Sequence, residues 1–118
     1  MSRGRKATLH GIVFDSQIEL ARYIQLYAMA QAGEISNLTC HPVFELQPRF
    51  VDRHTGKIVR PITYTADFQY CENGGLIVED VKARDRKTGK ARIPREGRLR
   101  IKLFQYQNRQ IEFRTVVM

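Results

Sequence analysis

Two cysteines, Cys40 and Cys71, are too few for a disulfide framework, which favours a reducing compartment. The chain also lacks any apolar run that approaches the roughly 18 residues of a membrane span. Its basic start, residues 1–6, has no apolar segment after it, so a secretory signal is not expected. These absences predict a cytoplasmic protein.

Length and composition predict one folded domain. The 118 residues allow a single modest core, and a hydrophobic content of 42% argues against a disordered chain. We expect a flexible basic tail over residues 1–7 and a single domain over residues 8–118. Within that domain, the sequence predicts a mobile basic loop over residues 85–95.

Acidic side chains are scarce in residues 82–102, which hold two Asp/Glu and ten Lys/Arg. By contrast, residues 7–81 hold nine Asp/Glu and five Lys/Arg. The whole chain has a net charge of +8 and a pI of about 9.9. Such a cluster predicts a polyanion partner, with a solvated basic loop as the alternative. Phosphate contacts position nucleic acid without reading its sequence, so weakly specific binding is expected. The expected contact residues are Arg84, Arg86, Lys87, Lys90, Arg92, Arg95, Arg98, Arg100 and Lys102.

Two runs rich in β-branched and aromatic residues flank the sequence Asn73-Gly74-Gly75, which predicts a hairpin. A turn at the first two of these residues places Asp67 directly opposite Asp80. A turn one residue later places Asp67 opposite Lys82. Because side chains alternate along a strand, both registers put all three side chains on one face. Glu79 should point to the other face, as a surface residue or in a layer behind the site.

Two carboxylates this close repel each other unless a cation or a shared proton offsets their charge. Mg²⁺ typically takes one or two protein carboxylates. As a functional hypothesis, Asp67 and Asp80 bind Mg²⁺ or Mn²⁺, and the Val81 carbonyl adds a ligand. Lys82 would orient or help deprotonate a metal-bound water and neutralise the phosphate. The alternative is a solvated strand face that carries an Asp–Lys ion pair.

A capping-box pattern, Ser16-Gln17-Ile18-Glu19, predicts a helix that continues to Gln31 and ends before Gly33. On this pattern alone, Glu19 belongs to the cap, because a capping-box glutamate reaches back to the N-cap amide.

Residues 96–107 fit two structures. Leu99, Ile101 and Leu103 alternate as in a strand, while Leu99, Leu103 and Tyr106 fit one helical face. We favour the helix, because the central strands are apolar enough to need cover on both sides. The other expected elements are a turn over residues 35–38 and strands over residues 9–14, 43–51, 58–70 and 111–117, with Pro48 and Pro61 as interruptions.

Five segments in this order resemble the PD-(D/E)XK nuclease superfamily. They resemble more closely a family of short phage and prophage endonuclease-like domains of unknown function. Two positions depart from the pattern: Ala66 stands where the name motif has Pro, and Arg100 where the close family more often has Lys. The segments are Gly11–Ser16 with Glu19, Phe44–Pro48, Tyr64–Phe68, Val78–Lys82 and Arg100–Phe104.

The resemblance implies a restriction-endonuclease-like α/β (α+β) core. Its central mixed sheet would have a helix on each side, in the order helix–strand–strand–strand–helix–strand. Asp67 would be the first motif acid and Asp80 the second, and Lys82 would complete the motif. Glu19 matches the acid that many members carry on the first helix, which adds metal binding to its possible capping role.

The resemblance also implies an enzyme, a metal-dependent endonuclease that hydrolyses DNA phosphodiester bonds. Its expected substrate is branched DNA, such as a Holliday junction, in phage recombination or replication. Junction cleavage needs two cuts and this chain offers one site, so a homodimer fits that activity. Two alternatives stay open. One is a basic DNA-binding module that has the nuclease fold without catalysis, and the other is an RNA-binding protein.

Overall fold

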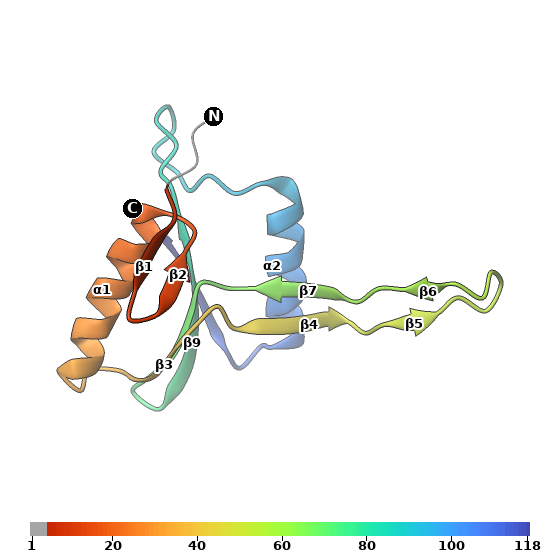
Figure 1. The fold of residues 1–118 in the computed structure, drawn as a ribbon, viewed down its shortest axis with the longest axis horizontal. Helices are drawn as coiled ribbons and strands as arrows, with labels where there is room; N and C mark the ends of the chain where they lie inside the picture. The colour runs from red at the N-terminus through yellow and green to blue at the C-terminus, as the bar shows by residue number, and fades with distance from the viewer. Residues whose placement is uncertain (1–4) are drawn as a thin grey trace.

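The computed structural model describes residues 5–118, which form a mixed α+β fold with two helices and a mixed sheet (Figure 1). The central sheet has four strands in the spatial order β10–β9–β8–β3. Strands β9 and β10 run parallel, and the other neighbours are antiparallel. The bounds are β3 (Ser36–Cys40), β8 (Phe68–Glu72), β9 (Gly75–Lys82) and β10 (Glu112–Val117).

The two helices, α1 (Gln17–Gln31) and α2 (Arg95–Gln107), pack on opposite faces of this sheet. Side chains of β9 alternate between them. Ile77 and Val81 lie in the core cluster that contains residues of α1, and Val78 lies in the cluster that contains residues of α2. This alternation is the period of two expected of a strand that is buried on both faces. Two helices and a mixed sheet agree with the class expected from the sequence.

The predicted hairpin forms between β8 and β9, with Asn73 and Gly74 as its turn. Both turn residues have positive φ, 50° and 79°, as a type I′ turn requires. Glu72 pairs with Gly75, and the ladder continues to the pair of Phe68 with Glu79. The first of the two predicted registers is therefore confirmed.

The start of the chain differs from expectation. Instead of one strand over residues 9–14, β1 (Ala7–Leu9) and β2 (Ile12–Phe14) form a small antiparallel hairpin around a turn at His10 and Gly11. Ala7, the last residue of the expected flexible tail over residues 1–7, belongs to β1. Residues 1–4 lie outside the part of the chain that the structure describes.

The turn predicted over residues 35–38 is wrong. Residues Ser36–Cys40 form the edge strand β3, which pairs with β8. The pairing shifts register between Ser36 and Thr39, and Asn37 has a positive φ of 55°. This bulge interrupts the polar–apolar alternation by which a strand is recognised in a sequence.

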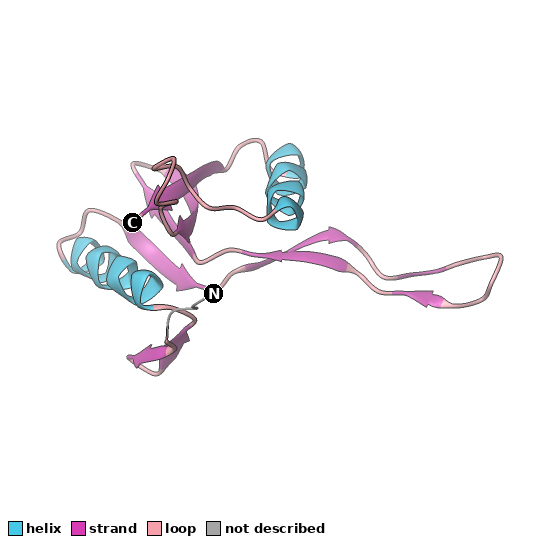
Figure 2. Ribbon diagram, turned by 90° about the horizontal axis from the view of Figure 1, so that it is seen from above, coloured by secondary structure: helices cyan, strands magenta, loops and turns pink. Residues whose placement is uncertain are grey.

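Between β3 and β8 the chain makes a long two-stranded arm, which projects away from the sheet in both views (Figures 1 and 2). Near the sheet, β4 (Val43–Gln47) pairs with β7 (Ile62–Thr65). Farther out, β5 (Phe50–Val51) pairs with β6 (Ile58–Val59). Pro48 and Pro61 lie opposite each other in the gap between these two pairings. This is expected, because proline has no backbone N–H to donate to the hydrogen bonds between strands.

Residues 95–107 form a helix, as favoured, but the predicted apolar face is not the buried one. Ile101 and Phe104 are buried, whereas Leu99, Leu103 and Tyr106 are exposed. The helix packs over the base of the arm and contacts β4 and β7, so the position of the arm decides which helical face is covered.

The basic loop is folded into a compact turn. Arg84 and Ala91 form an isolated β-bridge, and the Asp85 carboxylate accepts hydrogen bonds from the amides of Lys87 and Thr88 at 2.8 and 3.0 Å. Within residues 5–118, neither helix has the length and apolar character needed to cross a membrane.

Candidate active site

The two motif acids meet where the chain passes from the arm into the sheet. Asp67 lies between β7 and β8, and its backbone N–H points at β9. It lies 3.1 Å from the Glu79 carbonyl oxygen and 3.1 Å from Asp80 Oδ1. In return, the Val81 N–H donates to Asp67 Oδ2 at 2.7 Å. Each carboxylate is thus anchored by a backbone amide at the end of the hairpin, which fixes the two side chains against each other.

Asp80 is buried and has two further partners on the α2 face. The Tyr64 hydroxyl donates to Asp80 Oδ2 at 2.6 Å, and Lys82 Nζ lies 3.7 Å from the same oxygen. Lys82 itself is partly exposed. The prediction that Asp80 and Lys82 share a face is therefore confirmed, and the structure brings Asp67 beside them.

Glu19 approaches the acids from α1, in company with a histidine. Ser16 is the N-cap and its hydroxyl accepts from the Glu19 amide, which is half of the predicted capping box. The Glu19 carboxylate, however, bonds to His41 Nε2 at 2.7 Å and is itself buried. The backbone N–H of His41 donates to the backbone carbonyl of Asp67 at 2.9 Å. His41 thus connects the Glu19 carboxylate to the backbone of the first motif acid.

Burial raises the pKa of both motif acids, and like charges also act on Asp67. Burial, with smaller contributions from the negative charges of Asp80 and Glu19, raises the pKa of Asp67 from its ordinary value of 3.8 to about 8, although the hydrogen bond from the Val81 amide opposes the rise. Burial also raises the pKa of Asp80, while bonds from Tyr64 and the charge of Lys82 hold it down. The site therefore concentrates negative charge that its own cations offset only in part.

A divalent cation fits this donor set. Within residues 5–118, no three His, Cys, Asp or Glu side chains are arranged as a ligand cluster. Mg²⁺ does not require one, since it usually binds one or two carboxylates and keeps several waters. Asp67 and Asp80 would hold the cation, with Glu19, whose charge acts on Asp67, as an additional carboxylate. The Val81 carbonyl stays a predicted ligand; its amide is the part of Val81 that contacts Asp67.

Glu79 points away from the motif acids, as the alternation requires, but it is not a surface residue. It is fully buried on the α1 face. Arg22 binds both of its carboxylate oxygens, at 2.9 and 2.6 Å, and the Tyr70 hydroxyl donates to it as well. Glu79 is thus the centre of a buried ion pair behind the site.

Most of the predicted phosphate-binding cations are exposed. The exception is Arg100, whose guanidinium donates to the Thr63 carbonyl and pairs with Glu96 at 2.8 Å. We therefore assign Arg100 to holding α2 against the base of the arm. The exposed ones are Arg84, Arg86, Lys87, Lys90, Arg92, Arg95, Arg98 and Lys102.

Sequence reasoning missed three residues of this arrangement: His41, Tyr64 and Arg22. Tyr64 has the pattern of an ordinary core residue, and it is buried. Arg22 lies 57 positions before its partner Glu79, and His41 lies 22 positions after Glu19. No local spacing signals such pairs. One sequence feature marks the position of His41: it directly precedes Pro42, at the point where the chain leaves β3 for the arm.

Comparison with known proteins places the chain in a family without a described activity. A family model described as "Protein of unknown function (DUF1064)" matches residues 2–118, so the chain belongs to that family. No curated protein and no solved structure matches it. The function is therefore inferred from the chemistry of the site.

Proposed function

We propose that the protein is a divalent-metal-dependent endonuclease of the PD-(D/E)XK superfamily that hydrolyses DNA phosphodiester bonds. The observation that carries the proposal is the group of Asp67, Asp80 and Lys82 at the end of one hairpin. Two anchored acids with raised pKa values and a lysine 3.7 Å from one of them would form a site for a cation beside a bound phosphate. The chain order α1–β3–β8–β9–α2–β10, with the arm inserted after β3, supports the superfamily fold.

The roles of the residues follow from their positions. Asp67 and Asp80 bind Mg²⁺ or Mn²⁺, and such an ion, when bound, lowers the pKa of a coordinated water and stabilises charge on the phosphate. Lys82 orients the attacking water and donates to a phosphate oxygen. Tyr64 holds the Asp80 carboxylate in place. The exposed cations between Arg84 and Lys102 hold the DNA backbone.

A second function is favoured by one observation. Both oxygens of Asp80 already accept hydrogen bonds within the protein, from Tyr64 and from the Asp67 amide. Such a satisfied carboxylate is also expected in a basic DNA-binding module that uses these acids only to stabilise its hairpin.

Cleavage assays separate the two. The protein is incubated with linear, flapped and four-way DNA, and with matched RNA, in Mg²⁺, Mn²⁺ or EDTA. We expect cuts on branched DNA in either metal and none in EDTA. Asp67→Asn is the matched control, since it keeps the size of the side chain and removes its charge. Tight binding without any cut in either metal would favour the binding module.

A further inference from the structure

The far end of the arm exposes apolar side chains that the protein's own core does not cover. Val51 is 52% exposed and Ile58 is 59% exposed, and Phe50 is 47% exposed. The arm carries them away from the sheet and both helices (Figure 1). Apolar groups on a projecting ribbon indicate contact with a partner.

These side chains lie on both faces of the ribbon. Phe50 pairs with Val59, and Val51 pairs with Ile58, so the two pairs point to opposite sides. A flat partner surface would cover only one pair. A groove, which contacts a ribbon on two sides, would cover both.

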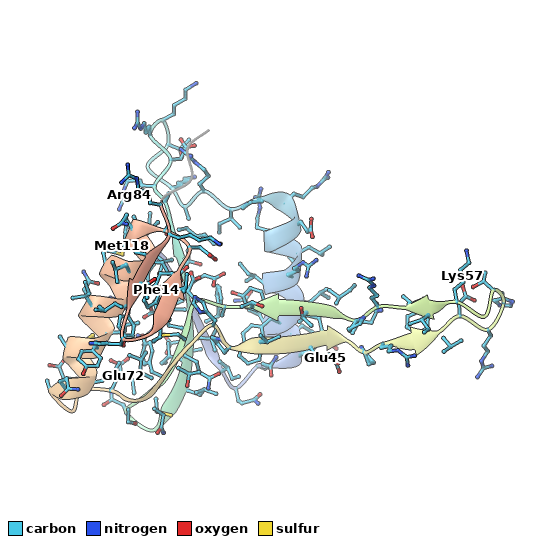
Figure 3. All side chains as sticks on the ribbon, viewed as in Figure 1. Phe14, Glu45, Lys57, Glu72, Arg84 and Met118 are labelled. Carbon is cyan, nitrogen blue, oxygen red and sulfur yellow. The ribbon has the colours of Figure 1, made fainter. Side chains whose placement is uncertain are left out.

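The same segment is rich in positive charge. Residues 49–60 contain four Arg/Lys and one Asp, and Lys57 lies near the tip of the arm (Figure 3). All four cations are exposed. Because the whole chain carries a net charge of +8, a second copy of the chain would bring like charges together. A polyanion fits this surface better. The four cations are Arg49, Arg53, Lys57 and Arg60.

We propose that the arm is a second nucleic-acid-binding element. It would enter a groove of a duplex and bind the duplex at a distance from the cutting site. The major groove of DNA admits a two-stranded β-ribbon. The cations would contact phosphates on the two walls, and the apolar pairs would contact the sugars and base edges between them.

The reach of the arm suits this role. The extended chain from Val43 to Asp52 spans roughly 30 Å, close to the length of about one turn of duplex. A duplex cut beside Asp67 and Asp80 would then meet the arm about one turn away. The inference rests on the proposed function for the place of the cut, but not for the binding itself.

The test measures binding without cleavage, by fluorescence anisotropy in EDTA with a duplex of about thirty base pairs and with a four-way junction. Two double variants address the two features of the arm. Arg53→Ser with Lys57→Ser removes charge, and Val51→Ser with Ile58→Ser removes apolar surface. A matched control, Lys6→Ser with Arg109→Ser, removes the same charge elsewhere. Circular dichroism and melting temperature check that each variant is folded.

The two arm variants should differ in their salt dependence. The charge variant should weaken binding and reduce the slope of log K against log salt by about 1.8, at about 0.9 for each lost phosphate contact. The apolar variant should weaken binding at every salt concentration and leave the slope unchanged. The control should change binding less than the charge variant does.

Wild-type affinity in both arm variants would overturn the proposal. So would a change in sedimentation from dimer to monomer in the apolar variant with binding unchanged, since the arm would then contact a second copy. The proposed function fails separately. If the wild type cuts nothing yet the arm variants bind weakly, the arm inference stands and the nuclease does not.

Discussion

Arg22 on α1 holds the buried Glu79 carboxylate of β9 with both ends of its guanidinium, at 2.9 and 2.6 Å, directly behind the motif acid Asp80. Adjacent residues of one strand thus have opposite roles. Glu79 is bound at two points by Arg22, whereas Asp80 has a single, longer ion pair with the partly exposed Lys82, at 3.7 Å.

Arg22→Met should destabilise the protein strongly, because it leaves the Glu79 charge buried without its partner. The expected cost is about 3–5 kcal/mol, the scale for breaking a buried ion pair from one side. Urea unfolding in EDTA measures it. Arg98→Met, on the exposed face of α2, is the control and should stay within about 0.5 kcal/mol of wild type. Equal effects of the two variants would contradict a structural role for the Arg22–Glu79 pair.

The raised pKa of Asp67 predicts how stability depends on pH when no metal is present. The folded pKa of about 8 lies above the ordinary value of 3.8, so the folded state binds a proton more tightly than the unfolded chain. The contribution of Asp67 to stability is therefore largest below about pH 4 and is lost as the pH rises through about 8. Inside that window the slope approaches about 1.4 kcal/mol per pH unit for one proton.

Unfolding of wild type and Asp67→Asn in EDTA, from pH 6 to pH 9, tests this dependence. The wild type should lose stability across the range, and the asparagine variant should lose less. Parallel curves for the two proteins would show that Asp67 titrates normally.

Divalent ions should stabilise the folded protein, because only the folded state holds the two motif acids together. At about 100 times the dissociation constant the gain is roughly 2.7 kcal/mol. Thermal unfolding with and without Mn²⁺ measures it. Asp80→Asn should abolish the gain, whereas Glu112→Gln, a change to an exposed carboxylate on β10, should preserve it. A melting temperature that does not respond to millimolar Mn²⁺ argues against a metal site.

The parts of the fold that were predicted correctly depend on neighbours in sequence. The Asn73-Gly74 turn alone fixed the register that sets Asp67 beside Asp80, because a type I′ turn determines its own pairing. The buried face of α2 could not be predicted in this way. Which of its residues are covered depends on β4 and β7, which lie about 55 and about 40 residues earlier in the chain.

The basic turn beyond β9 should contribute phosphate contacts of equal strength on any DNA sequence. Replacing Arg86, Lys87 and Lys90 with serine should weaken binding and lower the slope of log K against log salt by about 2.7, at about 0.9 for each contact. Anisotropy titrations at several salt concentrations in EDTA measure both quantities. If affinity and slope match the wild type, these exposed side chains are solvated and do not touch the DNA.

Lys82 separates binding from catalysis. Its side chain is partly exposed and makes one ion pair, so Lys82→Ala should leave the fold nearly unchanged. It should also retain most of the DNA affinity, because one phosphate contact among many is lost. Cleavage should nevertheless fall by on the order of a hundredfold or more, the scale for removing a group that positions a proton or stabilises charge in the transition state. Lys102→Ala, an exposed lysine on α2, is the matched control and should cut at nearly the wild-type rate. If Lys82→Ala cuts as fast as that control, the enzyme does not use Lys82 in the chemical step, and the cation bound at Asp67 and Asp80 would have to stabilise the phosphate without it.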